Sequence, residues 1–204
     1  MVSYGAKLDK SFYMRDTLTV TEELLGKMLV HVDDEGAETV AEIMETEAYT
    51  GVEDKACHSY NGRKTGRMIV MYRDGGYAYV YSLYGHALFN AVTEAEGIPC
   101  CVLVRRCRPI DGLGLMAQRR YGKEYAKLGR TAVREMMSGP GKVCQAMGIT
   151  TRHNSLNLTG GKLFIAEPLL QQRFQVGQGK RINLGKVGEA ANYPYRYFIK
   201  KNVQ

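Results

Sequence analysis

The chain has 204 residues, a hydrophobic fraction of 45% and a formal net charge of +7, which suits one globular domain with its own core. No stretch is long and apolar enough to span a bilayer, and MVSYGAKLDK lacks the apolar centre of a secretory signal. The five cysteines fall in no disulfide-framework spacing and form no C-x-x-C pair, so we expect reduced thiols and an intracellular protein.

The first predicted elements are a short helix and a hairpin. Thr19 and Glu22 have the spacing of a capping box, which predicts a helix through EELLGKML. LVHV, the turn DDEG and TVAEIMETEAY then read as two strands joined by a turn. GGYAYVYSLYG is a further strand signal with tyrosine at every second position, and CVLVRRC is its expected partner.

The second half of the chain predicts two helices and several short strands. Asp111 could cap a helix through GLMAQRRYGKEYAKLG, and SGPGKVCQAMG resembles a turn followed by a short helix. LFIAEP, QRFQV, KRINL and YRYFIKK read as short strands. Because helices and strands do not alternate as in βαβ units, we predict an α+β fold. We expect a single compact domain over residues 1–204, with a mixed, mostly antiparallel sheet and surrounding helices.

Charge is distributed unevenly along this chain. Residues 1–58 hold 5 Lys and Arg against 13 Asp and Glu, whereas residues 105–134 and residues 150–204 each hold 9 against 2. One strongly basic face would fit a polyanionic partner, in a cell usually nucleic acid. A basic but merely solvated surface explains the same composition.

The segment AEIMETEAYTG places acids in an apolar setting. In an extended strand Glu45 and Glu47 share one face and stand roughly 6.5–7 Å apart, near the separation of about 6.5–9.5 Å in inverting glycosidases. Two neighbouring acids also tend to separate their pKa values, which is one route to a general base. A solvated strand end paired with Arg or Lys explains the same pattern.

Aromatic and cationic residues follow the acids. CHSYNGRKTGR sets His58 beside three cations, and Tyr84 with Gly85 falls where the tyrosine-rich strand should turn. An aromatic side chain at a hairpin tip can enter a stacked structure as a wedge, and aromatics interleaved with cations bind extruded bases. A packed sheet face explains the tyrosine ladder alone equally well.

Metal and phosphate-loop chemistries are poorly supported. The four histidines show no zincin spacing, and the zinc-deaminase signature is absent. GPGK and GQGK fall short of a phosphate-binding loop and are read as turns. We therefore expect neither a metal nor another cofactor.

METEAYTGVEDKACHS, YAYVYSLYG, the Asn of LFN, VLVRRCRPIDG and SGPGKVCQAMGI occur in an order and at a spacing that resemble the alkyladenine (3-methyladenine) DNA glycosylase family of base-excision repair. The resemblance runs from about residue 11 to residue 200. It implies a compact mixed α/β domain whose protruding hairpin enters the minor groove of damaged double-stranded DNA. It also implies a monofunctional hydrolase, which we expect to act as a monomer away from membranes, in the cytoplasm and nucleoid or in a nucleus.

The resemblance implies roles for three residues close to the chemistry. Glu47 matches the acid that activates the attacking water, and Arg105 matches an Arg beside that water and the target's phosphate. Tyr84 matches the hairpin tyrosine that fills the space vacated by the extruded base. A carboxylate near C1′ could also stabilise the oxocarbenium character that develops there.

Four further residues are implied to form the base pocket. Tyr49, His58 and Tyr81 match residues that stack on or contact the flipped base. Asn90 matches the Asn that crowds a purine 2-amino group and disfavours normal guanine. The substrates implied are alkylated or deaminated purines, of the class of 3-methyladenine, 7-methylguanine, hypoxanthine and ethenoadenine.

Three alternatives remain open at this point. A non-catalytic module that binds damaged DNA would keep the basic surface and the aromatics. A bifunctional glycosylase would also nick the strand through a Schiff base, and a glycosidase of free nucleosides would need neither Tyr84 nor the basic segments.

Overall fold

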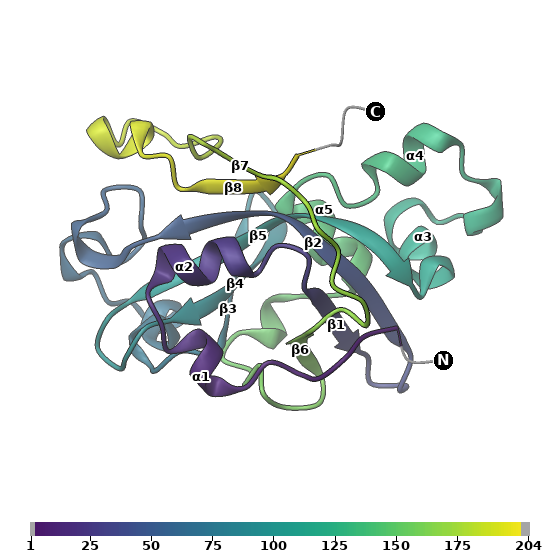
Figure 1. Ribbon diagram of the computed structural model, residues 1–204, viewed down its shortest axis with the longest axis horizontal. Coiled ribbons are helices and arrows are strands. Elements are labelled where there is room, and N and C mark those ends of the chain that lie inside the picture. Colours follow the sequence, from purple (N-terminus) through teal and green to yellow (C-terminus); the bar gives the residue numbers. More distant parts are fainter. Residues whose placement is uncertain (1–2, 201–204) are drawn as a thin grey trace.

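A computed structural model describes residues 3–200. The predicted domain extends beyond these residues at both ends. Lys201, the last residue of the predicted YRYFIKK strand, also lies outside them. Figure 1 shows a curled sheet with helices packed around it. The α-helices are α1 (Lys10–Tyr13), α2 (Thr17–Glu23), α3 (Leu113–Tyr121), α4 (Arg130–Glu135) and α5 (Pro140–Met147). The strands are β1 (Met28–Val32), β2 (Glu38–Tyr49), β3 (Ala78–Leu83), β4 (His86–Thr93), β5 (Cys100–Asp111), β6 (Leu163–Ala166), β7 (Val176–Gly179) and β8 (Arg196–Ile199).

The sheet is built around the two longest strands, β2 and β5. Its order is β3-β4-β5-β2-β1-β6, with β8 pairing both β2 and β7. Within residues 3–200 every strand pairing is antiparallel, and the α+β prediction is confirmed. The first half of β2 pairs with β1, whereas Glu45–Glu47 pairs with β8, and the β2–β5 register shifts on both sides of Glu45. This irregularity lies at the predicted acids.

The predicted capping box at residue 19 is wrong. Helix α2 begins at Thr17, and the Asp16 carboxylate caps it by accepting a hydrogen bond from the Thr19 N–H. The helix ends at Glu23, and β1 begins at Met28, inside the segment predicted to be helical. Asp is among the best N-cap residues, so the cap lies three residues earlier than the capping-box pattern indicates.

The predicted long helix capped by Asp111 is also wrong. Asp111 is the last residue of β5, and the residue before α3 is Gly112 with φ 73°. A Cβ at Gly112 would approach the Glu38 carbonyl oxygen to 2.5 Å, so a side chain is excluded there. Gly122, with φ 62°, ends α3, and a 3₁₀ turn at Tyr125–Lys127 and helix α4 follow. Helix α5 lies within the segment predicted for it.

The tyrosine-rich strand forms a hairpin with the segment that directly follows it. Strand β3 pairs with β4, and β4 in turn pairs with β5, so the predicted direct pairing with CVLVRRC is wrong. Tyr84 and Gly85 form the two-residue turn with φ values of 49° and 79°. Positive φ at both central residues matches the right-handed twist of the flanking strands. The predicted turn at Tyr84 is confirmed.

The C-terminal strand predictions are confirmed in part. LFIAEP and YRYFIKK contain β6 and β8. The predicted strand QRFQV contributes only its last residue, Val176, to β7, and KRINL contains no helix or strand. Those two predictions are therefore wrong. In the KRINL segment the Ile182 N–H donates to the Glu47 carboxylate instead of to a neighbouring strand. No helix within residues 3–200 is long and apolar enough to cross a membrane.

A buried cluster beneath the β3–β4 hairpin supports the candidate site. Its members come from β3, β4, β5 and the segment between β2 and β3, and four tyrosines pack against it. The buried members are Cys57, Met68, Val70, Met71, Tyr79, Val92 and Cys101. They hold one wall of the pocket described next.

Candidate active site

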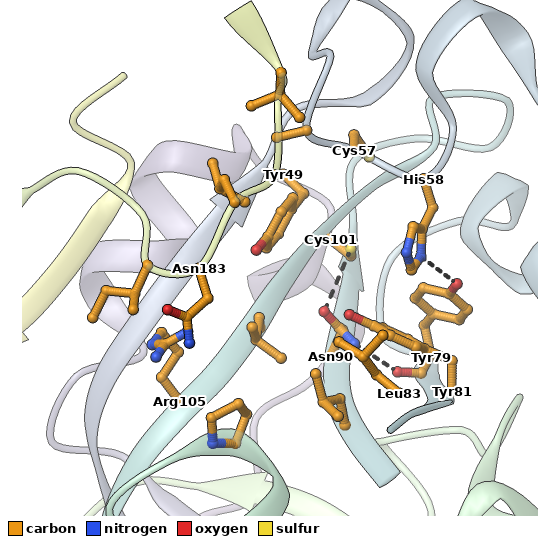
Figure 2. Close-up of a pocket in the computed structure, with 18 of the residues that line it drawn as sticks. Tyr49, Cys57, His58, Tyr79, Tyr81, Leu83, Asn90, Cys101, Arg105 and Asn183 are labelled. Atoms are coloured by element: carbon orange, nitrogen blue, oxygen red, sulfur yellow. Dashed lines mark hydrogen bonds between the residues drawn. The ribbon is translucent and has the colours of Figure 1, made fainter. Parts of the chain in front are cut away.

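A cavity of about 260 Å³ opens where β2, β3, β4 and β5 meet the segment 182–187 (Figure 2). This volume lies just below the usual range of roughly 300–1,000 Å³ for small-molecule sites, which suits a single nucleobase better than a larger ligand. Five residues singled out in the sequence line it together: Tyr49, His58, Tyr81, Asn90 and Arg105. They come from four strands and a loop, spread over 57 positions of the chain.

One end of the cavity is aromatic. The His58 Nδ1 atom lies 2.8 Å from the Tyr79 hydroxyl, and the His58 and Tyr81 ring centroids are 4.6 Å apart in an edge-on arrangement. Burial lowers the pKa of His58, and the cations Arg67 and Arg63 lower it further. The imidazole is therefore neutral near pH 7, and it can hydrogen-bond or stack without adding a charge to the pocket.

The floor of this end holds Asn90 in a fixed orientation. Its side chain is buried, and its Nδ2 donates to the Tyr79 carbonyl oxygen at 3.0 Å. The Cys101 Sγ donates to its Oδ1 at 3.8 Å (Figure 2). These partners on both ends of the carboxamide assign which atom is nitrogen. Asn90 therefore presents a rigid polar edge to the cavity.

The other end of the cavity leads to Glu47. Its carboxylate accepts hydrogen bonds from the Ile182 N–H at 2.7 Å and from the Tyr49 hydroxyl at 2.9 Å. The Arg105 Nη1 lies 3.4 Å from Oε1. Glu47 itself is completely buried, and these three partners, rather than Glu47, form the cavity wall. The acid thus lies one side chain behind the pocket.

The surroundings of Glu47 raise its pKa, which makes the carboxylate a stronger base. Burial raises the pKa of Glu47, and this effect outweighs the lowering by Arg105, by the Ile182 N–H and by the Tyr49 hydroxyl. A carboxylate whose pKa is raised towards the working pH accepts a proton more readily than an exposed one. The site therefore holds a carboxylate whose charged form is disfavoured by burial but still accepts two hydrogen bonds.

Glu45 contacts the same arginine. Its Oε1 lies 3.3 Å from Arg105 Nε and 3.3 Å from Arg196 Nη1. The alternation of the strand thus brings both predicted acids, Glu45 and Glu47, to one guanidinium. Glu45 has two arginine partners, as expected of a residue with a positioning or ion-pairing role.

A second arginine, which the sequence reasoning missed, holds the wall in place. Arg181 donates to Asp54 through two hydrogen bonds of 2.5 and 2.8 Å, and both side chains are completely buried. Arg181 also donates to the Ala48 carbonyl oxygen at 2.9 Å, and its Cζ lies 4.8 Å from the Tyr49 ring centroid. The residue after it is Ile182, so this pair anchors Tyr49 and Ile182, two of the three partners of Glu47.

Tyr84 lies outside the cavity, at the tip of the β3–β4 hairpin. Its side chain is 94% exposed, which is rare for an aromatic residue without a partner. Arg63, Lys64 and Arg67 are exposed on the neighbouring loop, and the Arg67 Cζ lies 5.8 Å from the Tyr81 ring centroid. An exposed wedge and a cationic rim therefore border an aromatic pocket.

Comparison with known proteins agrees with this geometry. The family model described as methylpurine-DNA glycosylase (MPG) matches residues 11–203. The chain belongs to the methylpurine-DNA glycosylase family. It is therefore a DNA glycosylase, a hydrolase of DNA repair.

Curated relatives of this glycosylase cover nearly the whole chain. Proteins of Desulfitobacterium hafniense (strain Y51), Clostridium acetobutylicum and Alkaliphilus oremlandii (strain OhILAs) are 44%, 41% and 42% identical to it. The alignments span 95–96% of this chain and 95–96% of the relatives. Each relative bears the name "Putative 3-methyladenine DNA glycosylase".

Within residues 3–200 the glycosylase has no group of three or more side chains suited to hold a metal ion.

Proposed function

We propose that this glycosylase removes alkylated or deaminated purines, of the class of 3-methyladenine, 7-methylguanine, hypoxanthine and ethenoadenine, from duplex DNA and leaves an abasic site. The observation that carries the proposal is the connection between an aromatic cavity of nucleobase size and a buried carboxylate, made through Tyr49 and Ile182. We further propose that the chain acts as a monomer, as one domain over residues 1–204 and without a cofactor.

In the proposed reaction a water oxygen bonds to C1′ as the bond from C1′ to the base nitrogen breaks. The electron pair leaves with the base, and Glu47 accepts the proton that the water loses. The anionic carboxylate also stabilises the positive charge that develops on the sugar. Bases such as 3-methyladenine already carry positive charge, so they leave as neutral molecules without an added proton.

Access to Glu47 requires a small movement of the pocket wall. The acid is sealed by Tyr49 and by Ile182, which is itself 36% exposed. Residues 180–187 contain no helix or strand, and the Ile182 N–H bonds directly to the Glu47 carboxylate. DNA binding can therefore admit a water between Glu47 and the sugar by displacing this segment without breaking the sheet.

Recognition is divided between the cavity and the hairpin. Tyr49, His58 and Tyr81 offer faces for stacking on an electron-poor base, and Asn90 sets the polar edge that a normal guanine would meet. Tyr84 fills the space left in the duplex. Because a damaged pair costs less to open, the flipping step adds to the selectivity.

Base release from duplexes that each carry one 7-methylguanine, hypoxanthine or ethenoadenine tests the proposal, with methylated DNA as the source of 3-methyladenine. The released product is identified by mass. We expect free damaged purine and an unbroken abasic strand, with no adduct trapped by borohydride. No release from any of these substrates would contradict the proposal, and a trapped adduct would point to a bifunctional enzyme.

Tyr84→Ala distinguishes a duplex enzyme from a hydrolase of free nucleosides. The substitution removes an exposed side chain, so the fold should be unaffected. Unstacking the duplex costs a few kcal/mol, and the inserted tyrosine offsets part of this cost. Base release from duplex should therefore fall at least about tenfold. Undiminished release from duplex would remove Tyr84 from the mechanism.

A further inference from the structure

Asn183 is a polar residue in the cavity wall that the described reaction does not use. It lines the same cavity as Arg105 and Tyr49, and Figure 2 draws its carboxamide projecting from the segment 182–187 towards Arg105. Its neighbour Ile182 bonds to Glu47 Oε1, the same oxygen that Arg105 Nη1 approaches. Asn183 therefore belongs to the acid end of the cavity, across from Asn90.

The backbone at Asn183 is unfavourable for a residue with a side chain. Its φ is 56°, in the left-handed region that glycine adopts without steric cost. Asn tolerates this region better than most residues, but glycine would still be less strained there. Asn183 differs from Asn61, an exposed residue with the same φ of 56°, because Asn183 lines the cavity and Asn61 does not.

The position of the glycosidic bond indicates which part of a nucleotide Asn183 would meet. A base held among Tyr49, His58 and Tyr81 must place its C1′ towards Glu47 for the proposed reaction. The sugar and its phosphate then lie on the Arg105 side, at the mouth. Asn183 is exposed at that mouth, which fits contact with the DNA backbone and does not fit contact with the buried base edge.

We propose that Asn183 binds the backbone of the extruded nucleotide, donating its carboxamide N–H to a phosphate oxygen beside Arg105. The inference rests on the proposed function, because the base must enter the cavity. Phosphate contacts set position and affinity and carry no information on the base. Asn183 therefore strengthens the binding of every substrate to a similar extent.

The test is the affinity of Asn183→Gly for a duplex that carries a stable abasic analogue, measured beside single-turnover base release. Glycine removes the carboxamide and suits the observed φ, so the variant should fold at least as well as the wild type. We expect binding to weaken by about tenfold or more, since a hydrogen bond to a charged group contributes at least about that factor, with the maximal release rate within about twofold. The loss in binding should be the same for duplexes with different lesions.

Two further variants make the test specific. Asn183→Asp keeps the shape but sets an anion beside the phosphate, so it should weaken binding more than glycine does. Asn61→Gly is the matched control, because Asn61 is exposed, has the same φ of 56° and does not line the cavity. It should bind the abasic duplex like the wild type, and an equal loss in that control would overturn the inference.

Other outcomes also overturn the inference and separate it from the proposed function. Unchanged binding by Asn183→Gly removes the contact, a fall in the release rate alone assigns Asn183 to the water, and a lesion-dependent effect assigns it to the base. If the wild type releases no damaged base from any duplex, the proposed function itself fails. If the wild type is active and Asn183→Gly behaves identically, only the inference about Asn183 fails and the proposed function stands.

Discussion

Tyr49 contacts two arginine–carboxylate clusters, one through its hydrogen bond to Glu47 and the other through its ring against Arg181, and the two clusters are built differently. Arg181 and Asp54 are both completely buried and share two hydrogen bonds of 2.5 and 2.8 Å. Arg105 instead lies 3.3 Å from Glu45 and 3.4 Å from Glu47 and lines the cavity. The first pair satisfies its charges, whereas the second leaves Glu47 with a raised pKa.

The difference shows how the end of one strand can hold both a structural ion pair and an ion pair suited to proton transfer. A buried ion pair is costly to break because the remaining partner is left charged and unpaired. A buried carboxylate whose ion pair does not offset its burial costs stability itself but keeps a usable basicity. Arg181 and Asp54 therefore form a buried structural ion pair, whereas Arg105 and Glu47 are the residues that we propose for catalysis.

The largest expected effect comes from breaking the buried structural ion pair. Asp54→Asn leaves the Arg181 guanidinium buried without its counter-ion, so we expect the free energy of unfolding to fall by about 3–5 kcal/mol. Urea denaturation measures the change. A loss below about 1 kcal/mol, the range of exposed ion pairs, would mean that the two clusters do not differ as described.

Removing Arg105, the ion-pair partner of Glu47, should change the rate of base release and its pH dependence. Arg105 lowers the pKa of Glu47, so Arg105→Gln raises that pKa further and reduces the anionic fraction at a given pH. We expect base release at neutral pH to fall about 10²-fold. The acid limb of the rate–pH profile should move to higher pH, and an unmoved limb would separate Arg105 from the ionisation of Glu47.

A smaller effect should appear in the pH dependence of stability. The folded-state pKa of Glu47 is raised above its unfolded value of 4.5, so the folded protein holds this proton more tightly than the unfolded chain does. Its contribution to stability is complete below that value and is lost as pH rises through the folded pKa. Glu47→Gln should therefore be more stable relative to the wild type at pH 8 than at pH 4, as thermal unfolding at both values would show. The opposite trend would contradict a raised pKa.

The smallest effect is expected at Glu45. It is paired with Arg105 and Arg196 at 3.3 Å but remains partly exposed, at 14% of its side chain. Glu45→Gln keeps the shape, so we expect a stability loss of about 1 kcal/mol or less and base release within about fivefold of the wild type. A fall in base release as large as that of Glu47→Gln would mean that the two acids act as a pair.

The elements that depend on local sequence could be predicted. The β1–β2 turn, the Tyr84 turn and α5 follow from turn residues and alternation close to one another in the chain. Strand alternation also predicts that Glu45 and Glu47 share one face, and in the structure both lie near Arg105. No strand is predicted at HALFNAVT, so the pairing of β3 with β4 could not be predicted either.

The wall of the site could not be predicted from local patterns. The pair of Asp54 and Arg181 joins positions 127 residues apart, and no spacing rule indicates such a contact. KRINL looks like a strand, yet its Ile182 N–H bonds to Glu47 instead of to a neighbouring strand. For the same reason the sequence gives no measure of how deeply Glu47 is buried or of the part that Asn183 takes in the cavity.

The most direct test of the account is Glu47→Gln, measured in parallel for single-turnover base release and for binding to a duplex with an abasic analogue. Gln keeps the size of the side chain and an acceptor for the Ile182 N–H but removes the base. We expect release to fall by about 10³-fold or more, with unchanged affinity and no loss of stability. Base release by this variant at the wild-type rate would contradict the central role of Glu47.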